Sequence, residues 1–356
     1  GDANNSIFIY SGRTSKAVEG YQTGRRIQFD NELYKTISEE FNQDIEFITA
    51  RVYKNVTASF ANEKSNYTVR AVNPDHQFIE KSEIKEGRFI NSLDIKNNTK
   101  NIVIGNLVVE DLFPNTNPVG KYLDLDKIKF KIVGVFVERS EGSDSNEARI
   151  IYMPISTAQK IYGNNDYIDQ INLTYNKGLS EQEAIAFGNN IVDRIKDIFF
   201  VADNDQSAVR ARNRARENQE ITQFNAILAI LVLIIGMGTL VAGIVGISNI
   251  MIFIVKERTK EIGIRKALGA PPNSIIILII LESIFVTAIS GYFGLLLGGT
   301  LLNSFDLRDY WIYDPGVSSS LVIAATITLV IAGAIAGYIP AKRAASIKPI
   351  VALRDE

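Results

Sequence analysis

An uncharged stretch of 32 residues, from Phe224 to Val255, restricts the fold of this chain more than any other feature of its sequence. About 20 apolar residues are enough for a helix to cross the hydrocarbon layer of a bilayer. Two further apolar runs follow, from about Ile275 to Leu302 and from about Leu321 to Ile339. Backbone polar groups inside lipid must be satisfied within the segment, so each run is expected to be a helix. The sequence therefore predicts a membrane protein with three spans.

The average composition conceals this organisation. The 356 residues are 46% hydrophobic and 22% charged, with a formal net charge of -2, which are the values of an ordinary soluble protein. Polar residues nevertheless dominate up to about residue 205, whereas residues 224–340 contain almost all of the long apolar runs. We therefore predict an outer domain at 1–205, a stalk helix at 206–223 and a transmembrane domain at 224–356.

The residue types that carry chemistry are scarce. The chain has no cysteine and a single histidine, His76, so it offers neither a disulfide framework nor a histidine-based metal or catalytic cluster. We expect His76, which lies in a polar segment, to be a solvated side chain. Neither the phosphate-binding loop pattern nor the dinucleotide fingerprint occurs. The sequence therefore predicts no catalytic, cofactor-binding or metal-binding residue, and no nucleotide site in this chain.

The distribution of basic residues predicts the topology. The segment between the first two spans contains five of them and the C-terminal tail contains four, whereas the loop at 303–320 has only Arg308 against three aspartates. The positive-inside rule then places the hairpin and the tail in the cytoplasm and residues 1–205 outside. A large outer domain needs a translocation signal, and the sequence starts at Gly1 without a signal-peptide pattern. We therefore expect a further membrane helix upstream, which would give four spans.

The outer domain has the signature of an α+β fold. Candidate strands, each rich in β-branched or aromatic residues, are Ser6–Tyr10, Asp44–Phe60 with a break, Tyr67–Val72, Asn101–Gly105, Lys129–Arg139, Arg149–Met153 and Gln170–Tyr175. Asp30 can cap a helix that contains Leu33 and Ile37, and Ser180 with Glu183 forms a capping box ahead of a second helix. The order of these elements predicts an α+β domain.

The segment from Ser207 to Gln223 contains no Gly or Pro and is predicted to be a helix that runs without a break into the first span. Such a helix would form a stalk, and the alternative is a charged helix end that contacts lipid headgroups or the outer domain. Its arginines do not predict a nucleic-acid site, because this segment lies outside the membrane and the whole chain is slightly acidic.

The hairpin between the first two spans is predicted to contain a short helix from Lys256 to Leu268. Glu261 stands four residues before Arg265, which is the favourable order for an ion pair on a helix. Gly269 can end this helix, and Pro271-Pro272 prevents its continuation. Its apolar side chains, which could bury against a neighbour or dip into the headgroup region, are Ile262, Ile264, Ala267 and Leu268.

Two features of the second span carry structural expectations. Small residues recur at three- and four-residue spacing, at Gly291, Gly294, Gly298 and Gly299, which permits close helix packing. We favour packing within one copy of the chain over a dimer contact. Glu282 lies inside the same span, where a carboxylate needs a partner or an interfacial position. We favour a structural partner over a proton-relay role for it.

Two C-terminal segments, Ser248–Ala270 and Gly337–Arg354, closely resemble the signature of MacB/FtsX-type ABC transporter permeases. In the outer domain, shorter motifs resemble the MacB-type periplasmic core domain; they are Glu86–Phe89, Asn117–Gly120, Ile132–Phe136 and Tyr152–Ala158. The resemblance covers nearly the whole chain. The chain departs from the family pattern in lacking the first membrane helix and the ATPase domain, which some members fuse to the permease and others supply as a separate subunit.

The resemblance implies a permease with four membrane helices that works as a homodimer with two cytoplasmic ATP-binding subunits, which would bind the ATP and Mg²⁺. The hairpin at 256–270 then corresponds to the coupling helix that contacts the ATPase. The residues that the resemblance implies for this contact are Glu257, Arg258, Glu261, Ile262, Ile264 and Arg265. Movement of this helix would be transmitted to the periplasmic domain, a mechanism called mechanotransmission.

The resemblance leaves several functions open. The favoured one is a permease of the bacterial inner membrane that drives efflux of drugs, peptides or similar substrates, with a periplasmic adaptor and an outer-membrane channel as further partners. The alternatives are a lipoprotein-releasing permease and an FtsX-like regulator that transmits the state of the ATPase to a cell-wall hydrolase. A membrane-bound enzyme is disfavoured, because no catalytic constellation occurs in the sequence.

Overall fold

The computed structural model describes residues 3–114, 116–137, 146–163, 166–304 and 319–348. The chain forms two compact units, Gly1–Phe224 and Asn225–Glu356, which we call the outer unit and the membrane unit. Three predicted features lie outside the described residues: the end of the strand at 138–139, the loop charges at 306–314, and Arg354 of the tail.

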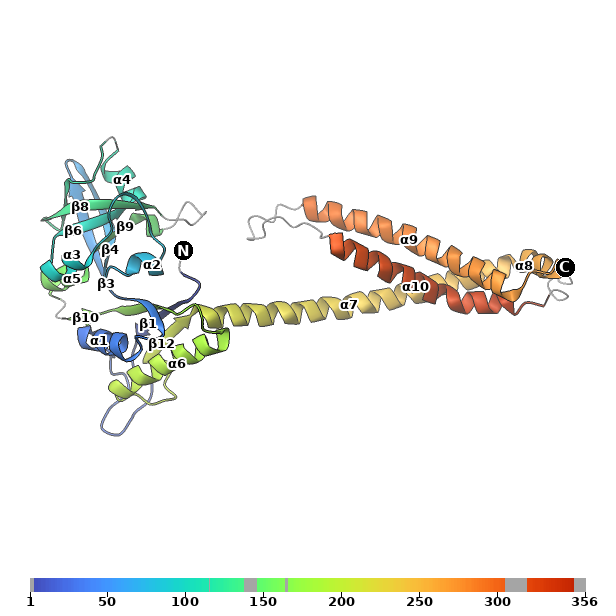
Figure 1. Cartoon of the computed structure of the whole chain (residues 1–356), viewed down its shortest axis with the longest axis horizontal. Coiled ribbons are helices and arrows are strands. Elements are labelled where there is room, and N and C mark those ends of the chain that lie inside the picture. Colours follow the sequence, from blue (N-terminus) through green and yellow to red (C-terminus); the bar gives the residue numbers. More distant parts are fainter. Residues whose placement is uncertain (1–2, 115, 138–145, 164–165, 305–318, 349–356) are drawn as a thin grey trace. The chain divides into compact units, whose positions relative to one another are not determined.

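The outer unit is built on one mixed sheet, so the predicted α+β fold is confirmed (Figure 1). Within the described residues ten strands pair in the order β12-β1-β11-β3-β4-β9-β6-β8-β5, with β7 beside β3 and β8. Their bounds are β1 (Ser6–Ser11), β3 (Ile45–Phe60), β4 (Glu63–Val72), β5 (Glu83–Gly87), β6 (Asn101–Gly105), β7 (Tyr122–Leu125), β8 (Ile128–Val137), β9 (Ile150–Pro154), β11 (Gln170–Tyr175) and β12 (Val209–Asn213). A separate pair joins β2 (Phe29–Asp30) to β10 (Tyr167–Ile168).

The central strand β3 is continuous over 16 residues, so the predicted break within it is wrong. Lys54 and Asn55 are exposed there, but their backbone stays in register opposite Val69 and Thr68 of β4. The first half of β3 also pairs with β11, and its end pairs with β7. Neighbouring strands therefore satisfy the backbone where the side chains alone suggest a loop.

Six α-helices and one 3₁₀ turn accompany the sheet in the described part of the outer unit, and they are α1 (Asn31–Glu40), α2 (His76–Ile79), α3 (Ser92–Asn97), α4 (Asn106–Leu112), η1 (Asn146–Arg149), α5 (Ile155–Tyr162) and α6 (Glu181–Ile198). Both predicted caps are present. The Asp30 carboxylate accepts a hydrogen bond from the Leu33 amide at 2.8 Å, and Ser180 and Glu183 form the reciprocal capping box of α6. The amphipathic faces of α1 and α6 pack into the main hydrophobic core.

His76, which we expected to be a solvated side chain, is instead part of a buried ion network. His76 is fully buried in α2, and its Nε2 lies 2.9 Å from Glu80 Oε2. Arg51 and Arg70 also pair with this carboxylate, and the Tyr152 hydroxyl donates to it at 2.9 Å. The prediction fails because α2 has only four residues, too few to show a periodic apolar pattern.

Burial sets the protonation preferences in this network. It lowers the pKa of His76 and so favours the neutral imidazole. Burial alone would raise the pKa of Glu80, but the positive charges of Arg51 and Arg70 beside it outweigh this effect and hold that pKa well below its usual range. The network therefore keeps a carboxylate charged inside the outer unit.

The predicted helix at 206–223 is wrong in its first part, because Val209–Asn213 form the edge strand β12. This strand pairs antiparallel with β1, from Ile7 opposite Asn213 to Ser11 opposite Val209. The edge of β1 offers unpaired backbone groups, and their pairing outweighs the local helix propensity. The long helix α7 begins directly afterwards and runs unbroken over Arg214–Glu257.

The membrane unit contains the rest of α7 and three further helices, α8 (Thr259–Ala267), α9 (Pro272–Ser304) and α10 (Ser319–Ala345). Three of the described helices, α7, α9 and α10, are long and apolar enough to cross a membrane, and each contains one of the predicted spans. The short α8 connects α7 to α9 and lies at one end of the long helices (Figure 1).

Close packing of α9 on α10 depends mainly on small residues of α10. A Cβ added at Gly337 would lie 2.8 Å from Ser283 Cβ, and one at Gly333 would lie 3.0 Å from Ile284 Cα. The buried Ser283 hydroxyl donates to the Gly333 carbonyl oxygen at 2.9 Å. This interface therefore combines backbone approach with an interhelical hydrogen bond, as membrane helix pairs commonly do.

The glycines that the sequence singled out on α9 differ in their surroundings. A Cβ added at Gly291 would clash with the side chain of Leu329 on α10. At Gly294, Gly298 and Gly299, by contrast, no described residue lies within 4 Å of such an atom. Gly291 thus contacts a helix of the same chain, whereas the other three face space that the described residues leave open.

Candidate functional site: the hairpin between the first two membrane helices

The hairpin begins where α7 ends, at Glu257, two residues later than the sequence predicted. Arg258 leaves helical geometry, with φ -91° and ψ 15°, and separates α7 from α8. The Thr259 hydroxyl donates to the carbonyl oxygens of Val255 and Lys256, at 3.1 and 2.8 Å. These contacts satisfy end groups of α7 that have no helical partner, so the predicted helix from Lys256 is divided at Arg258.

The end of α8 follows the predicted chemistry. Gly269 has φ +98°, a left-handed conformation that glycine adopts without strain. The amides of Gly269 and Ala270 donate to Lys266 and Arg265 carbonyl oxygens at 3.1 Å each. Pro272 is the first residue of α9, a position where a missing N–H costs nothing. The turn therefore fixes how α8 joins the second membrane helix.

One face of α8 is anchored in a small hydrophobic core. Ile262 is 7% exposed and packs where the end of α7, the start of α9 and the end of α10 meet. The other buried members of this cluster are Met251, Val255, Ile275, Ile279, Ala341 and Ala344. The hairpin therefore contacts all three long helices of the membrane unit.

Lys266 adds a polar connection from α8 to the end of α10. Its ammonium group donates to the carbonyl oxygens of Ala345 and Ile347, both at 2.7 Å. Cations at a helix C-terminus interact favourably with the unpaired carbonyls there. The sequence analysis missed this role, because the residues lie about 80 positions apart and nothing local links them.

The opposite face of α8 carries apolar side chains that are exposed. Ile264 is 45% and Leu268 84% exposed, and they lie four residues apart, on the same side of a helix. Ala267 is exposed as well. Of the four apolar residues that we expected to be available for burial, only Ile262 is buried within the chain.

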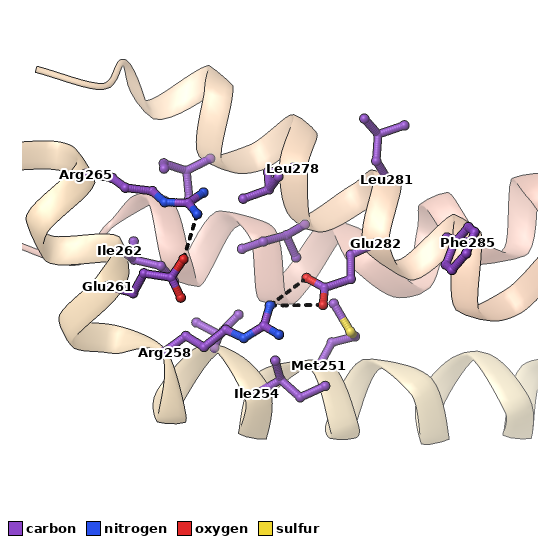
Figure 2. A pocket seen from close by; sticks show the side chains of 13 residues that line it. Met251, Ile254, Arg258, Glu261, Ile262, Arg265, Leu278, Leu281, Glu282 and Phe285 are labelled. Atoms are coloured by element: carbon purple, nitrogen blue, oxygen red, sulfur yellow. Dashed lines mark hydrogen bonds and ion pairs between the residues drawn. The ribbon is translucent and has the colours of Figure 1, made fainter.

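A groove of about 550 Å³ separates part of α8 from α7 and α9 (Figure 2). Two ion pairs lie along it: Arg258 Nη1 is 3.1 Å from Glu282 Oε1, and Arg265 Nη2 is 2.6 Å from Glu261 Oε1. The expected structural partner of Glu282 is therefore Arg258. A proton-relay role of Glu282 stays untested.

The six residues that the resemblance implies for the ATPase contact thus lie in different parts of the hairpin. Glu257 ends α7 and Arg258 follows it, while Glu261 and Arg265 pair on α8 and both remain about half exposed. Ile262 points into the small core, and Ile264 is exposed. Within the described residues, no group of three or more His, Asp or Glu side chains lies close enough to hold a metal ion.

A polar α+β unit followed by long apolar helices with an amphipathic hairpin defines a multipass membrane protein with a large domain outside the bilayer. Family models match both parts: the MacB-like periplasmic core domain over residues 1–186 and the FtsX-like permease C-terminal domain over residues 224–349. The chain belongs to the MacB/FtsX-like ABC transporter permeases, and the resemblance seen in the sequence is confirmed. Its place is the inner membrane, with the core domain in the periplasm.

Curated relatives agree with this assignment. The chain is 27% identical over 356 residues to the macrolide export ATP-binding/permease protein MacB of Bdellovibrio bacteriovorus, covering 99% of this chain and 54% of the relative. It is 29% identical over 290 residues to the protein of the same name from Mannheimia succiniciproducens, covering 78% and 42%. The chain spans about half the length of the curated relatives it matches.

A solved structure supports the fold of the outer unit. The periplasmic region of MacB from Actinobacillus actinomycetemcomitans is similar with a TM-score of 0.51 at 16% identity, covering 62% of this chain and 94% of that one. Similarity at this level of identity concerns the fold alone.

Proposed function

We propose that this chain is the permease subunit of a MacB-like ABC transporter. It would couple ATP hydrolysis by a cytoplasmic ATPase partner to a conformational change in the periplasm. One observation carries the proposal: α8 is anchored inward by Ile262 while Ile264 and Leu268, on its other face, are exposed. An apolar pair flanked by charged groups is the composition of a protein contact surface.

The geometry refines the contact residues that the resemblance implied. Ile264 and Leu268 would supply the apolar contact, and Glu257, Arg258, Glu261 and Arg265 the polar surroundings. Ile262 would act as an anchor that holds α8 on the membrane unit, because it is already buried there. A force on α8 would then be transferred to the helix ends that pack around Ile262.

Contacts at each of its ends suit α7 to transmit such a displacement. At its start, the Asn213 side chain accepts from the Ala215 amide at 3.0 Å and donates to the Ala184 carbonyl oxygen of α6 at 2.9 Å. The helix contains no proline, and proline is a main cause of sharp kinks. The proposal is that α7 conveys the movement of α8 to the outer unit, as mechanotransmission requires.

For the substrate we propose drugs, peptides or similar molecules, because the curated relatives are named macrolide export proteins. The proposed partners are the ATPase, a second copy of this chain, a periplasmic adaptor and an outer-membrane channel. Lipoprotein release and FtsX-like regulation remain the alternatives. Co-purification from membranes separates them: an adaptor with a channel supports efflux, and a cell-wall amidase supports regulation.

Site-specific photo-crosslinking tests the coupling role directly. A crosslinking amino acid at Ile264 or Leu268 in the full chain, illuminated in native membranes, is expected to capture a protein with an ATP-binding domain. The matched control is Leu297, which is 64% exposed on α9 and should capture no such protein. Products without an ATP-binding protein at either α8 position would refute the proposal.

A double substitution measures the strength of this contact. Ile264→Ala with Leu268→Ala is expected to weaken ATPase association about tenfold, the size of a modest interface hot spot. Leu93→Ala is the control, because Leu93 is 63% exposed in the outer unit. Unchanged association and unchanged ATP-driven activity in the double variant would contradict the assigned role.

A further inference from the structure

A polar pocket of about 510 Å³ lies in the outer unit where α6, β12 and the start of α7 meet. Figure 1 shows α6 beside β12 at the point where α7 begins. Gly188 of α6 permits this approach, since a Cβ there would lie 2.7 Å from Asn213 Nδ2. The pocket belongs wholly to the outer unit and shares no residue with the hairpin.

The charges that line this pocket are mainly positive. The pocket is lined by Lys196 of α6, Arg210 of β12 and Arg216 of α7, together with one carboxylate, that of Asp193. Asp193 is 67% exposed, and its Oδ1 is 3.9 Å from Lys196 Nζ, too far for a hydrogen bond. The pocket wall therefore carries an excess of positive charge.

Lys196 is unusual because its ammonium group is held inside the wall. The side chain is 8% exposed, and lysine is rarely buried without a paired charge. Its Nζ donates to the Asp203 carbonyl oxygen at 2.6 Å. An ammonium group has three N–H donors, so this contact leaves donor capacity at the pocket.

The two arginines also keep donors available. Arg216 Nη2 donates to Asn189 Oδ1 at 2.7 Å, which uses one of five guanidinium N–H groups. Arg210 is exposed beside the pocket on β12. Three cations from three different elements thus line the same pocket. Lysines and arginines scattered along the surface of one helix would not be gathered in this way.

We propose that this pocket binds a phosphate-bearing ligand through Lys196, Arg210 and Arg216. Phosphate oxygens accept several charge-assisted hydrogen bonds at once, and guanidinium groups match them in a two-pronged geometry. The volume exceeds that of a bare phosphate and has room for an attached organic group. The ligand can be a soluble phosphomonoester or the headgroup of an anionic phospholipid, because both present anionic phosphate oxygens.

This proposal is independent of the ATPase, so it can be tested on the full chain alone in a maltoside detergent that carries no phosphate. Titration calorimetry would use two probes, glycerol 1-phosphate and short-chain phosphatidylglycerol. We expect at least one of them to bind. Arg210→Gln and Arg216→Gln should each weaken that binding about tenfold, since each removes a charge-assisted hydrogen bond. Both side chains are exposed, so the variants should fold.

The control variant is Lys64→Gln, which removes an exposed cation from β4 and should change binding by less than about twofold. Binding of glycerol 1-phosphate identifies a soluble source, and binding of phosphatidylglycerol alone identifies a lipid headgroup. Absence of binding by both probes overturns the proposal. An equal loss in Lys64→Gln, or no loss in the two arginine variants, overturns it as well.

Discussion

Glu80 of the outer unit and Glu282 of the membrane unit both pair with arginine, but in contrasting surroundings. The Glu80 side chain is 10% exposed and pairs with Arg51 and Arg70, which are 5% and 14% exposed. The Glu282 side chain is 33% exposed and pairs with Arg258, which is 54% exposed. A buried carboxylate must be fully paired, whereas a half-exposed pair contributes little to stability.

The outer unit and the hairpin therefore differ in how much free energy it takes to break their charged contacts. The outer unit completes its charge network internally around Glu80. At the hairpin, the rest of the chain leaves the Arg258–Glu282 pair partly uncovered and Ile264 and Leu268 exposed. Breaking contacts at the hairpin therefore costs less free energy than breaking those in the outer unit, which suits a segment that responds to a partner.

The largest expected effect comes from Glu80→Gln. This change leaves Arg51 and Arg70 buried without their carboxylate, and it should lower the free energy of unfolding of the outer unit by about 3–5 kcal/mol. Denaturant-dependent proteolysis of the full chain measures it. The control Glu39→Gln removes an exposed pair with Lys35 and should cost less than about 0.5 kcal/mol. A loss below about 1 kcal/mol in Glu80→Gln would break the comparison.

In the membrane unit, stability is expected to depend on helix packing more than on ion pairs. Gly337→Ala places a Cβ 2.8 Å from Ser283 and should destabilise the α9–α10 pair by about 1–3 kcal/mol. Gly294→Ala, which meets no described residue within 4 Å, is the matched control. Unfolding of the purified chain in mixed micelles measures both. Equal effects of the two substitutions would show that α9 and α10 pack differently.

Asp94 of the outer unit provides a test by pH. Burial alone would raise its pKa, but hydrogen bonds from Arg88, Asn101 and Thr99 outweigh it and lower the pKa to about 2. The carboxylate therefore contributes about 2 kcal/mol of stability above pH 4, and this is lost as the pH falls through 2.

Replacing Asp94 by Asn should remove this contribution at neutral pH and flatten the stability profile between about pH 4 and pH 2. Proteolysis of the full chain across this pH range measures the profile. A variant that keeps the steep acid dependence of the wild type would show that other carboxylates cause it.

The smallest expected effect is that of Glu282→Gln. Because its pair with Arg258 is half exposed, the loss of stability should be below about 1 kcal/mol. Unfolding in mixed micelles measures it beside Gly337→Ala. A loss as large as that of Glu80→Gln would remove the contrast between the two units. ATP-driven transport that persists in this variant would also count against a proton role.

The parts that the sequence predicted well are those whose signal is local. The Asp30 cap, the Ser180–Glu183 capping box and the three apolar runs each lie within one continuous segment. The end of α8 at Gly269 belongs to the same group, because a left-handed glycine followed by prolines terminates a helix whatever surrounds it. Residue type and spacing are sufficient for such features.

The parts that the sequence missed depend on residues far apart in the chain. Strand β12 forms because β1 offers an edge, and β1 lies about 200 residues earlier. His76 lies in a buried network whose other members come from distant strands: Arg51 from β3, Arg70 from β4 and the Tyr152 hydroxyl from β9. The Lys266 contact depends on where α10 ends. In each case tertiary pairing decides between local alternatives, and one sequence does not reveal the pairing.

The Lys266 contact has one further consequence. It links α8 to the end of α10, and Ile262 links α8 to the ends of α7 and α9. In the proposed mechanism, a displacement of α8 would therefore act on the ends of all three long helices at once.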